Sequence, residues 1–386
     1  MKLLVISNLF PFPDQPSRGI FNANQFRELP PDFDTHVLVP VPFREWRRKY
    51  AQAQSWDRLK VRYLPFVYPP GIAQGWHGET MYLSILAGAR QWLAQLAPEI
   101  VLGSFLYPDG YAAARVAGRL HCPLVLKAHG SDVNQKGHRP ALRRRIAWAL
   151  QRADALVVVS EALRGELAAL GLNCQAVQVI GNGVDTVAFA PRDRGTSRAQ
   201  LGLPADERLV LFAGNLKADK GAVDAVRVVC RLNESGTRAR LVIVGDGTAA
   251  TLMRQAAVQR GGEELLLWQG RRAHSELPAY MNAVDLLLLP SHAEGVPNVV
   301  LEALACGIPV VASAVGGIPE VLRDSAGALV PAGDIAAFAL ACGAVLTRCF
   351  DRDAIRAQVM QRSWQGSAAQ LAAVLRGAVA RAAPGN

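Results

Sequence analysis

Two glutamates, Glu294 and Glu302, stand eight positions apart around a predicted strand–loop–helix junction. The preceding apolar run ends at Pro290, a helix is predicted to begin near Val296, and the next strand starts at Pro309. Glu294 therefore lies just before the helix and Glu302 about two turns into it, and each carboxylate can accept hydrogen bonds from ligand hydroxyls. The structural alternative makes Glu302 a solvated helix residue and Glu294 a carboxylate favoured by the helix dipole.

Groups suited to binding phosphate follow other predicted strands. Lys217 and Lys220 lie in the loop after the apolar run 208–213, while Gly316 and Gly317 follow a later strand. Glycines let backbone N–H groups approach an anion closely, and a helix N-terminus adds a favourable dipole. Each feature also has a plainer interpretation, as exposed loop lysines or as a connecting turn.

A histidine, His129, follows the buried run 124–128. A histidine at the end of a strand can donate to a sugar or a diphosphate, although a lone histidine is more often structural. Asp132 is equally suited to capping the segment that follows.

The elements that must position these residues are short apolar runs alternating with helical patterns. The runs are rich in Val, Leu and Ile without polar alternation, which is typical of strands covered on both faces. Repeated β-α units predict parallel sheets, and ligands bind at the carboxyl ends of such strands. The predicted strands are 2–7, 35–40, 61–66, 99–103, 124–128, 155–159, 177–180, 208–213, 240–244, 265–268, 285–289, 309–312 and 328–330, and the helical segments include 81–97, 221–235, 248–260 and 296–306.

A chain of 386 residues is too long for one hydrophobic core of ordinary size. The segment 186–207, which contains charged residues, prolines and glycines, interrupts the β-α rhythm, and the run 208–213 begins a fresh series. We therefore predict an α/β protein of two Rossmann-like domains with a cleft between them, 1–187 and 188–361.

The segment from Glu294 to Ala312 resembles the signature of family 4 retaining glycosyltransferases, Glu-Gly-x-Pro-x-x-x-x-Glu-Ala-x-Ala-x-Gly-x-Pro-Val-Val-Ala. This resemblance implies the GT-B fold, with parallel sheets facing across the cleft. It also implies that Glu294 lies near the donor sugar and that Glu302 binds the ribose of the nucleotide. The same motif assigns to the donor site Gly295, Val296 and Asn298.

Further motifs resemble the same family in order and spacing. The loop after 208–213 resembles a Gly-Arg-Leu-x-x-x-Lys-Gly motif that clamps the donor diphosphate: Lys220 matches the lysine, whereas Asn215 replaces the arginine. Lys217 lies close enough in sequence to compensate. The His-Gly motif implies that His129 is catalytic. The resemblance assigns the remaining donor contacts to Gly19, Gly245, Gly316, Gly317 and Ile318.

The reaction implied by the resemblance is transfer of a sugar from a UDP- or GDP-sugar to a hydroxyl of a glycan or lipid-linked acceptor, in bacterial surface or exopolysaccharide assembly. Anomeric configuration is retained, with a donor phosphate oxygen accepting the proton of the acceptor. Lys220, His129 and the loop amides would stabilise the departing diphosphate, and Glu294 would orient the sugar. No nucleophile, cofactor or metal is expected, and the Asp351-Arg352-Asp353 match is interpreted as coincidental. The segment 362–386 resembles the crossover helix that returns to the first domain.

The formal charge of +10 comes from 42 Lys and Arg against 32 Asp and Glu. Such a surplus is compatible with nucleic acid, an anionic membrane or a phosphorylated substrate, but no recognition motif supports nucleic acid. Two clusters gather in the first domain, and they comprise Arg44, Arg47, Arg48 and Lys49, and Arg139, Arg143, Arg144 and Arg145. The second cluster is either the solvated face of a core-facing helix or a surface that docks on an anionic leaflet bearing the acceptor.

The six cysteines are isolated, the N-terminus does not resemble a signal peptide, and no apolar run is long enough to span a bilayer. We therefore expect a cytoplasmic protein. A peripheral place on the inner face of the cell membrane is a further expectation. Three other functions stay open at this point. They are a nucleotide-sugar epimerase or hydrolase on the same architecture, a non-catalytic nucleic-acid or sugar-binding protein, and a family member weakened by Asn215.

Overall fold

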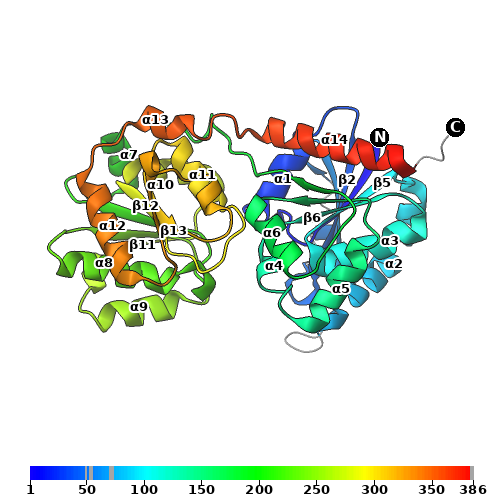
Figure 1. Ribbon diagram of the computed structural model, residues 1–386, viewed down its shortest axis with the longest axis horizontal. Helices are drawn as coiled ribbons and strands as arrows, with labels where there is room; N and C mark the ends of the chain where they lie inside the picture. Colours follow the sequence, from blue (N-terminus) through cyan, green and yellow to red (C-terminus); the bar gives the residue numbers. More distant parts are fainter. Residues whose placement is uncertain (48–49, 52–54, 69–73, 383–386) are drawn as a thin grey trace. The chain divides into compact units, whose positions relative to one another are not determined.

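The computed structural model describes residues 1–47, 50–51, 55–68 and 74–382 (Figure 1). The chain divides into two compact units: unit 1 consists of Met1–Asn182 and Trp364–Asn386, and unit 2 of Gly183–Ser363. The boundaries drawn from the sequence, after residues 187 and 361, differ from these by five and two residues. Arg48 and Lys49 of the first cationic cluster lie outside the described residues.

Unit 1 is built on an eight-stranded sheet in the order β3-β4-β2-β1-β5-β6-β7-β8. All neighbouring strands are parallel except β3 and β4. The sequence prediction missed β3 because it has only two residues and no apolar pattern. The strands are β1 Lys2–Ile6, β2 Asp34–Pro42, β3 Ser55–Trp56, β4 Leu59–Phe66, β5 Ile100–Ser104, β6 Leu124–Ala128, β7 Ala155–Val158 and β8 Val177–Val179.

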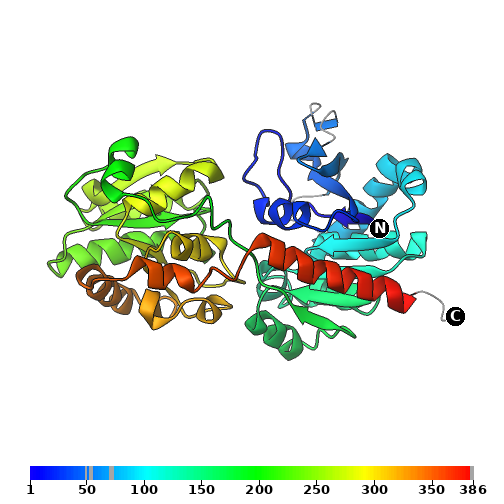
Figure 2. The same cartoon turned by 90° about the horizontal axis from the view of Figure 1, so that it is seen from above.

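Two layers of helices cover this sheet. Successive side chains of a strand point to opposite faces, so Leu4 and Ile6 of β1 join the core under α2, α3, α5 and α6, whereas Leu3 and Val5 join that under α1 and α14. Figure 2 shows α14, in red, lying along unit 1. The helices are α1 Ile20–Arg27, α2 His77–Leu96, α3 Tyr111–Leu120, α4 Ser131–Asn134, α5 Pro140–Leu150, α6 Glu161–Ala169 and α14 Trp364–Ala382, with short turns η1 Phe43–Glu45, η3 Gln74–Trp76 and η4 Leu106–Gly110.

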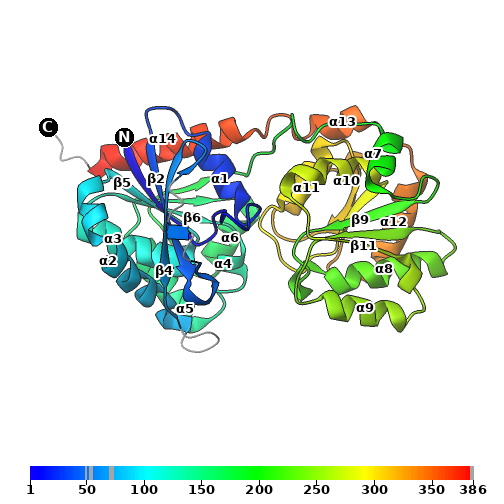
Figure 3. The ribbon, with the colours of Figure 1, turned by 180° about the vertical axis from the view of Figure 1, so that it is seen from behind.

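Unit 2 holds a six-stranded, wholly parallel sheet in the order β11-β10-β9-β12-β13-β14. Its strands are β9 Leu209–Ala213, β10 Arg240–Val244, β11 Leu266–Gly270, β12 Leu286–Leu289, β13 Val310–Ser313 and β14 Gly327–Val330. The helices are α7 Arg194–Leu201, α8 Ala222–Glu234, α9 Ala250–Val258, α10 Leu277–Ala283, α11 Asn298–Ala305, α12 Ile335–Thr347 and α13 Arg352–Ala357, with short turns η5 Ala218–Lys220, η6 Glu263–Leu265, η7 His274–Glu276, η8 Ile318–Glu320 and η9 Asp324–Ala326. Helices α8, α9 and α12 cover one face, and α10, α11 and α13 the other (Figure 3).

The strand order creates a switch point in each unit. In unit 2 the chain leaves β9 toward β10 and later returns to the other side of β9 as β12, so the loops after β9 and β12 meet at the carboxyl edge. In unit 1 the same holds for β1 and β5. Ligands of open parallel sheets bind at such switch points. The loops that bear Lys220 and Glu294 begin at the switch point of unit 2.

Candidate active site

The switch point of unit 2 brings Lys220 and Glu294 into contact. Lys220 ends η5 in the loop after β9, and its Nζ lies 2.7 Å from Oε2 of Glu294 in the loop after β12. The Glu294 side chain is 8% exposed and that of Lys220 is 31% exposed. Gly221 holds the two loops together: its φ is +67°, and an added Cβ would lie 1.9 Å from the carbonyl oxygen of Pro290. No larger residue fits there.

Ser291 completes this cluster. Its hydroxyl is fully buried and donates to Oε1 of Glu294 at 2.9 Å, so both carboxylate oxygens are engaged. Sequence reasoning included Ser291 in the loop without giving it a role, because nothing in a Pro-Ser-His stretch distinguishes a serine that orients a carboxylate from one that ends a strand.

The helix after this loop starts later than predicted. It begins at Asn298 rather than near Val296, because a residue before proline is disfavoured in the α region and Pro297 occupies the N-cap. Glu294 is therefore a loop residue outside the first helical turn, and its carboxylate contacts Lys220 and Ser291. The alternative that made Glu294 a first-turn carboxylate is wrong.

Glu302 is buried in α11, so the alternative that made it a solvated helix residue is also wrong. Its Oε1 lies 2.8 Å from Nε2 of His274, the first residue of η7, and the imidazole packs on Phe189 with ring centroids 5.3 Å apart. His274 was missed by sequence reasoning, since an isolated histidine between strands carries no signal. The pair places a carboxylate and an imidazole side by side, an arrangement suited to the hydroxyls of a ribose.

The glycine loop after β13 packs directly on the Glu294 loop. Gly316 has a φ of +54°, and a Cβ there would come within 2.1 Å of the carbonyl oxygen of Glu294. The amide of Gly317 donates to the carbonyl of Gly295 at 2.7 Å, and that of Ile318 donates to Val315 at 3.2 Å. Two of the three amides expected to contact phosphate are thus engaged within unit 2.

The remaining donor-site residues lie around the same edge. Asn215 and Lys217 are exposed in the loop after β9, and the carbonyl of Asn215 accepts from the amide of Lys217 at 2.9 Å. Gly245 follows β10 with a φ of +148°, and a Cβ would lie 1.9 Å from the carbonyl oxygen of Gly214. Val296 is buried, and Asn298 is the first residue of α11.

In unit 1 a hydrogen-bond chain fixes the tautomer of His129. Nδ2 of Asn22 donates to the carbonyl of Leu9 at 2.8 Å, which orients Oδ1 toward the hydroxyl of Ser104 at 3.0 Å. Because Oδ1 can only accept, Ser104 donates its one hydrogen to Asn22 and accepts from Nε2 of His129 at 2.9 Å. The hydrogen is therefore on Nε2, and Nδ1 presents a lone pair.

Burial keeps this imidazole neutral. Desolvation and the neighbouring Lys127 hold the pKa of His129 well below its usual value, and the ring lies between Phe21 and Phe105, at 4.9 and 4.8 Å between centroids. With Nδ1 unprotonated, a ligand would donate to this histidine rather than accept from it, so the expectation that His129 donates to a sugar or a diphosphate does not fit this tautomer. Neither Asn22 nor Ser104 was singled out in the sequence.

Asp132 has a structural role among the described residues. Its carboxylate accepts from the backbone amides of Leu106, His129 and Gly130 at 2.9–3.1 Å, which ties the loop after β6 to that after β5. Gly19, at φ +57°, would place a Cβ 2.3 Å from the carbonyl oxygen of Leu9, and so lets the loop after β1 fold back on itself.

A second buried chain starts at Lys127 of β6. The side chain is completely buried, and Nζ donates to Oε1 of Gln25 at 2.5 Å. Nε2 of Gln25 donates to the hydroxyl of Ser367 at 2.8 Å, and this hydroxyl donates to the carbonyl of Gly181 at 2.8 Å. Burial lowers the pKa of Lys127 to about 7.

The four arginines at α5 do not share one environment. Arg143 and Arg144 are exposed, whereas Arg145 is half-buried, donates to the hydroxyl of Tyr111 at 3.0 Å and lies over the ring of Trp76. The exposed Arg139 precedes the helix and donates to Oε1 of Gln74. The expected apolar stripe is confirmed, since the buried residues of α5 are Leu142, Ile146, Ala149 and Leu150.

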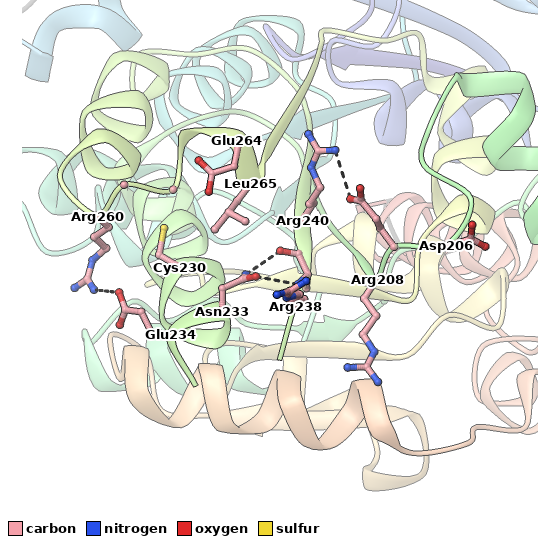
Figure 4. Close-up of a pocket in the computed structure, with 14 residues that line it drawn as sticks. Asp206, Arg208, Cys230, Asn233, Glu234, Arg238, Arg240, Arg260, Glu264 and Leu265 are labelled. Carbon is pink, nitrogen blue, oxygen red and sulfur yellow. Dashed lines mark hydrogen bonds and ion pairs between the residues drawn. The ribbon is translucent and has the colours of Figure 1, made fainter. Parts of the chain in front are cut away.

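Two other features lie away from these clusters. Asp351 caps α13 by accepting from the amides of Asp353 and Ala354, and no group of three or more His, Cys, Asp or Glu among the described residues is placed to hold a metal ion. A cavity of about 850 Å³ opens at the start of β9 and β10, the edge opposite Lys220 (Figure 4). Two of its arginines pair with carboxylates of the lining, Arg240 with Glu207 and Arg260 with Glu234.

Two family profiles match the chain: Glycosyltransferase Family 4 over residues 23–188, and Glycosyl transferases group 1 over residues 193–357. A protein of Bacillus subtilis (strain 168) named as a teichuronic acid biosynthesis glycosyltransferase, TuaC, is 30% identical over 336 residues, which cover 82% of this chain and 82% of that protein. The D-inositol 3-phosphate glycosyltransferase of Mycobacterium tuberculosis is 31% identical over 303 residues, 72% of this chain and 62% of its own length.

Solved structures share the fold over nearly the whole chain. A sucrose-phosphate synthase of Thermosynechococcus elongatus has a TM-score of 0.79 at 19% identity, with 99% of this chain and 100% of that chain covered. Anabaena HepE in complex with UDP and glucose has a TM-score of 0.76 at 20% identity, with 98% and 100% covered. The fold is GT-B, as expected, and the chain belongs to the group 1 glycosyltransferases of family 4.

Proposed function

We propose that the protein is a retaining hexosyltransferase that moves a sugar from a nucleoside diphosphate donor, a UDP- or GDP-sugar, to a hydroxyl of a glycan or lipid-linked acceptor. The observation that supports this most directly is the contact of Lys220, Glu294 and Ser291 at the switch point of unit 2. The Lys220 cation can bind a diphosphate, and the oriented Glu294 carboxylate beside it can bind sugar hydroxyls.

The proposed reaction breaks the bond between the anomeric carbon and the diphosphate oxygen and forms a bond to the acceptor oxygen on the same face. The acceptor proton passes to an oxygen of the leaving diphosphate. Lys220 stabilises the charge that develops there, where one preorganised donor contributes about 3 kcal/mol. Glu294 orients the sugar, and Glu302 and His274 accept hydrogen bonds from the ribose hydroxyls.

For unit 1 we propose that His129 accepts a hydrogen bond from the substrate at Nδ1, since Ser104 holds the proton on Nε2. Asn215 stands where the family has an arginine, so one fixed cation is missing from the leaving-group site. The exposed Lys217, two residues later, is the candidate to supply it.

The relatives suggest which donors and pathway to test first. HepE was solved in complex with UDP and with UDP-glucose, and TuaC is named for biosynthesis of teichuronic acid. We therefore propose a UDP-sugar donor and a place in bacterial surface polysaccharide assembly.

The decisive experiment combines binding and product analysis. Thermal-shift assays with UDP-, GDP- and ADP-sugars identify the donor, and Glu302→Gln should reduce the shift while leaving the fold intact. NMR of the product then reports the anomeric configuration. Inversion would refute the retaining mechanism, and complete turnover without an acceptor would favour the hydrolase alternative. The absence of a shift with every nucleotide sugar would contradict the whole proposal.

We also propose that transfer needs no metal ion. The Asp351–Asp353 pattern, the one sequence feature that suggested a metal, is accounted for by the capping of α13. Activity after dialysis against EDTA should equal that with added Mg²⁺ or Mn²⁺, and a loss restored by either ion would contradict the proposal.

We further propose that unit 1 docks peripherally on the inner face of the cell membrane through α5. Arg143 and Arg144 are exposed, and Trp76, at 59% exposure, lies beside the half-buried Arg145. Each basic residue near an anionic leaflet adds about 1 kcal/mol of attraction. Among the described residues no helix is long and apolar enough to cross a bilayer.

Co-sedimentation with anionic vesicles tests this surface. Arg143→Ala with Arg144→Ala should reduce binding, whereas Arg231→Ala with Arg238→Ala removes the same charge from exposed positions of unit 2 and serves as the control. Equal loss in both double variants would mean that net charge alone accounts for the binding, and unchanged binding of the α5 variant would refute the docking proposal.

A further inference from the structure

A cavity of about 630 Å³ lies in unit 1 beside the C-terminal turns of α3 and α5. Helix α3 follows β5 and runs back to the amino edge of the sheet, where His121 leads into β6. The cavity is thus at the edge opposite His129 and has no part in the proposed transfer. Its lining residues are Tyr82, Ala114, Arg115, Gly118, Arg119, His121, Trp148 and Arg152.

The titratable side chains that line this cavity are predominantly basic. It contains three arginines and a histidine, and none of the described residues that line it is Asp or Glu. The cavity of Figure 4 differs, because four carboxylate residues line it beside its arginines, and two of these arginines are paired with them. One carboxylate, Glu79, contacts Arg115 from outside the lining at 2.7 Å, while Arg119 has no acceptor among the residues that the structure describes. The net charge at the cavity therefore stays positive.

Two of the guanidinium groups are held against aromatic rings. Arg152 lies 3.9 Å from the ring centroid of Trp148 and donates to its carbonyl at 3.0 Å, and Arg115 lies 4.5 Å from the ring of Tyr82. The ring contact helps to hold each guanidinium in place, although Nη1 of Arg115 already donates to both carboxylate oxygens of Glu79, at 2.9 and 2.7 Å. Arg152 is therefore partly preorganised and keeps donors for a planar or bidentate acceptor such as phosphate.

Gly118 keeps the cavity open. It lies in the interior of α3, where glycine costs about 1 kcal/mol relative to alanine, and a Cβ added there meets nothing within 4 Å. Arg115 and Arg119 share a helix face because they are four residues apart, and Gly118 lies beside them. An ordinary side chain at position 118 would fit the helix but would project into the open space next to these arginines.

The plainer explanation is that arginines near helix C-termini interact with the helix dipole. That accounts for the positions of Arg119 and Arg152, but not for a cavity lined by three arginines and a histidine with no carboxylate among its described lining residues. We propose that this cavity binds a phosphate monoester or diphosphate group, either of a lipid headgroup or of a soluble metabolite. The proposal does not rest on the assignment of a transfer reaction.

Calorimetric titration with inorganic diphosphate tests the site in the full chain. Gly118→Glu places a carboxylate beside the arginines that line the cavity and should weaken binding about tenfold more than the neutral, equally long Gly118→Gln. Arg119→Lys keeps the charge for the helix dipole but loses the planar donor edge, and it should also weaken binding. Retained thermal shifts with a nucleotide sugar show that each variant is folded.

Diphosphate can also bind at Lys220, so Lys220→Ala is measured in parallel. Binding that survives Lys220→Ala and is lost in Gly118→Glu supports the cavity. Binding that is lost in Lys220→Ala and unaffected by Gly118→Glu overturns it.

Vesicles separate the two sources of the ligand. Phosphatidylcholine vesicles carrying phosphatidic acid present a phosphate monoester, and vesicles with a larger fraction of phosphatidylglycerol, chosen to match the total negative charge, present a diester. A preference for phosphatidic acid that Gly118→Glu abolishes identifies a lipid headgroup, whereas diphosphate binding without that preference identifies a soluble ligand. Failure of both would refute the proposal.

Discussion

Replacing Lys127 by methionine should stabilise unit 1 at about pH 6 and destabilise it near pH 10. The lysine is fully buried in β6, with Oε1 of Gln25 as its hydrogen-bond partner at 2.5 Å. Burial lowers its pKa from 10.5 to about 7, so between these values the unfolded chain binds more protons than the folded one. Stability contributed by this site therefore rises with pH across that window.

The magnitude follows from the two pKa values. The two pKa values differ by about 3.5, and one pKa unit corresponds to 1.36 kcal/mol. The folded state is therefore destabilised by about 5 kcal/mol when Lys127 is charged in both the folded and the unfolded state. Methionine removes this cost but leaves Oε1 of Gln25 without its donor, which costs about 1–3 kcal/mol. The variant should thus gain about 2–4 kcal/mol at pH 6, whereas near pH 10 less than about 1 kcal/mol of the lysine penalty is left and the lost hydrogen bond dominates.

The assay is urea unfolding of both proteins at the two pH values, with Lys217→Met as a control at an exposed position of unit 2. Subtracting the free energy of unfolding of the wild type from that of the variant at each pH cancels the titration of the groups that do not interact with Lys127. The effect of Lys217→Met on the free energy of unfolding should have the same sign at both pH values. A Lys127→Met effect that is the same at both pH values would refute the reasoning, because it would mean that burial does not shift this pKa.

Three further predictions concern the clusters at the carboxyl edges. Gly316→Ala should lower kcat/KM at least about tenfold, because its Cβ would displace the backbone of Glu294; activity within twofold of wild type would contradict this. Ser291→Ala removes a hydrogen bond to Glu294 and should raise the donor KM by about five- to tenfold, measured by steady-state kinetics. Ser104→Ala removes the acceptor of Nε2–H, so ¹⁵N NMR of His129 should show a mixture of tautomers in place of one.

The strands were predictable because both sheets are covered on both faces. An apolar run such as Leu286–Leu289, set between helical patterns, is typical of a buried parallel strand. The dipeptide strand Ser55–Trp56 was not predictable, since its pairing is decided by its neighbour β4 rather than by its own residues.

The proximity of two site residues was predictable only where both lie on one continuous stretch of chain, because their spacing in the sequence then fixes their separation. Glu294 and Glu302 belong to a single loop and helix, so their relation is local. His274 reaches Glu302, and Ser104 reaches His129, only through the order of strands in the sheet. The helix start was misjudged because the local effect of Pro297 on Val296 was not weighed.

The attachment of α14 to unit 1 has a consequence for synthesis. Ser367 bonds to Gln25 and Gly181, and the buried face of α14 completes the core beside β1. Unit 1 therefore cannot finish folding when residue 182 leaves the ribosome, because more than half of the chain, including α14, is still to be made. Unit 2 is contiguous and can close first, reversing the usual order in which an N-terminal domain folds ahead of the next. Until the last helix emerges, the apolar face that it covers has to be kept from aggregating.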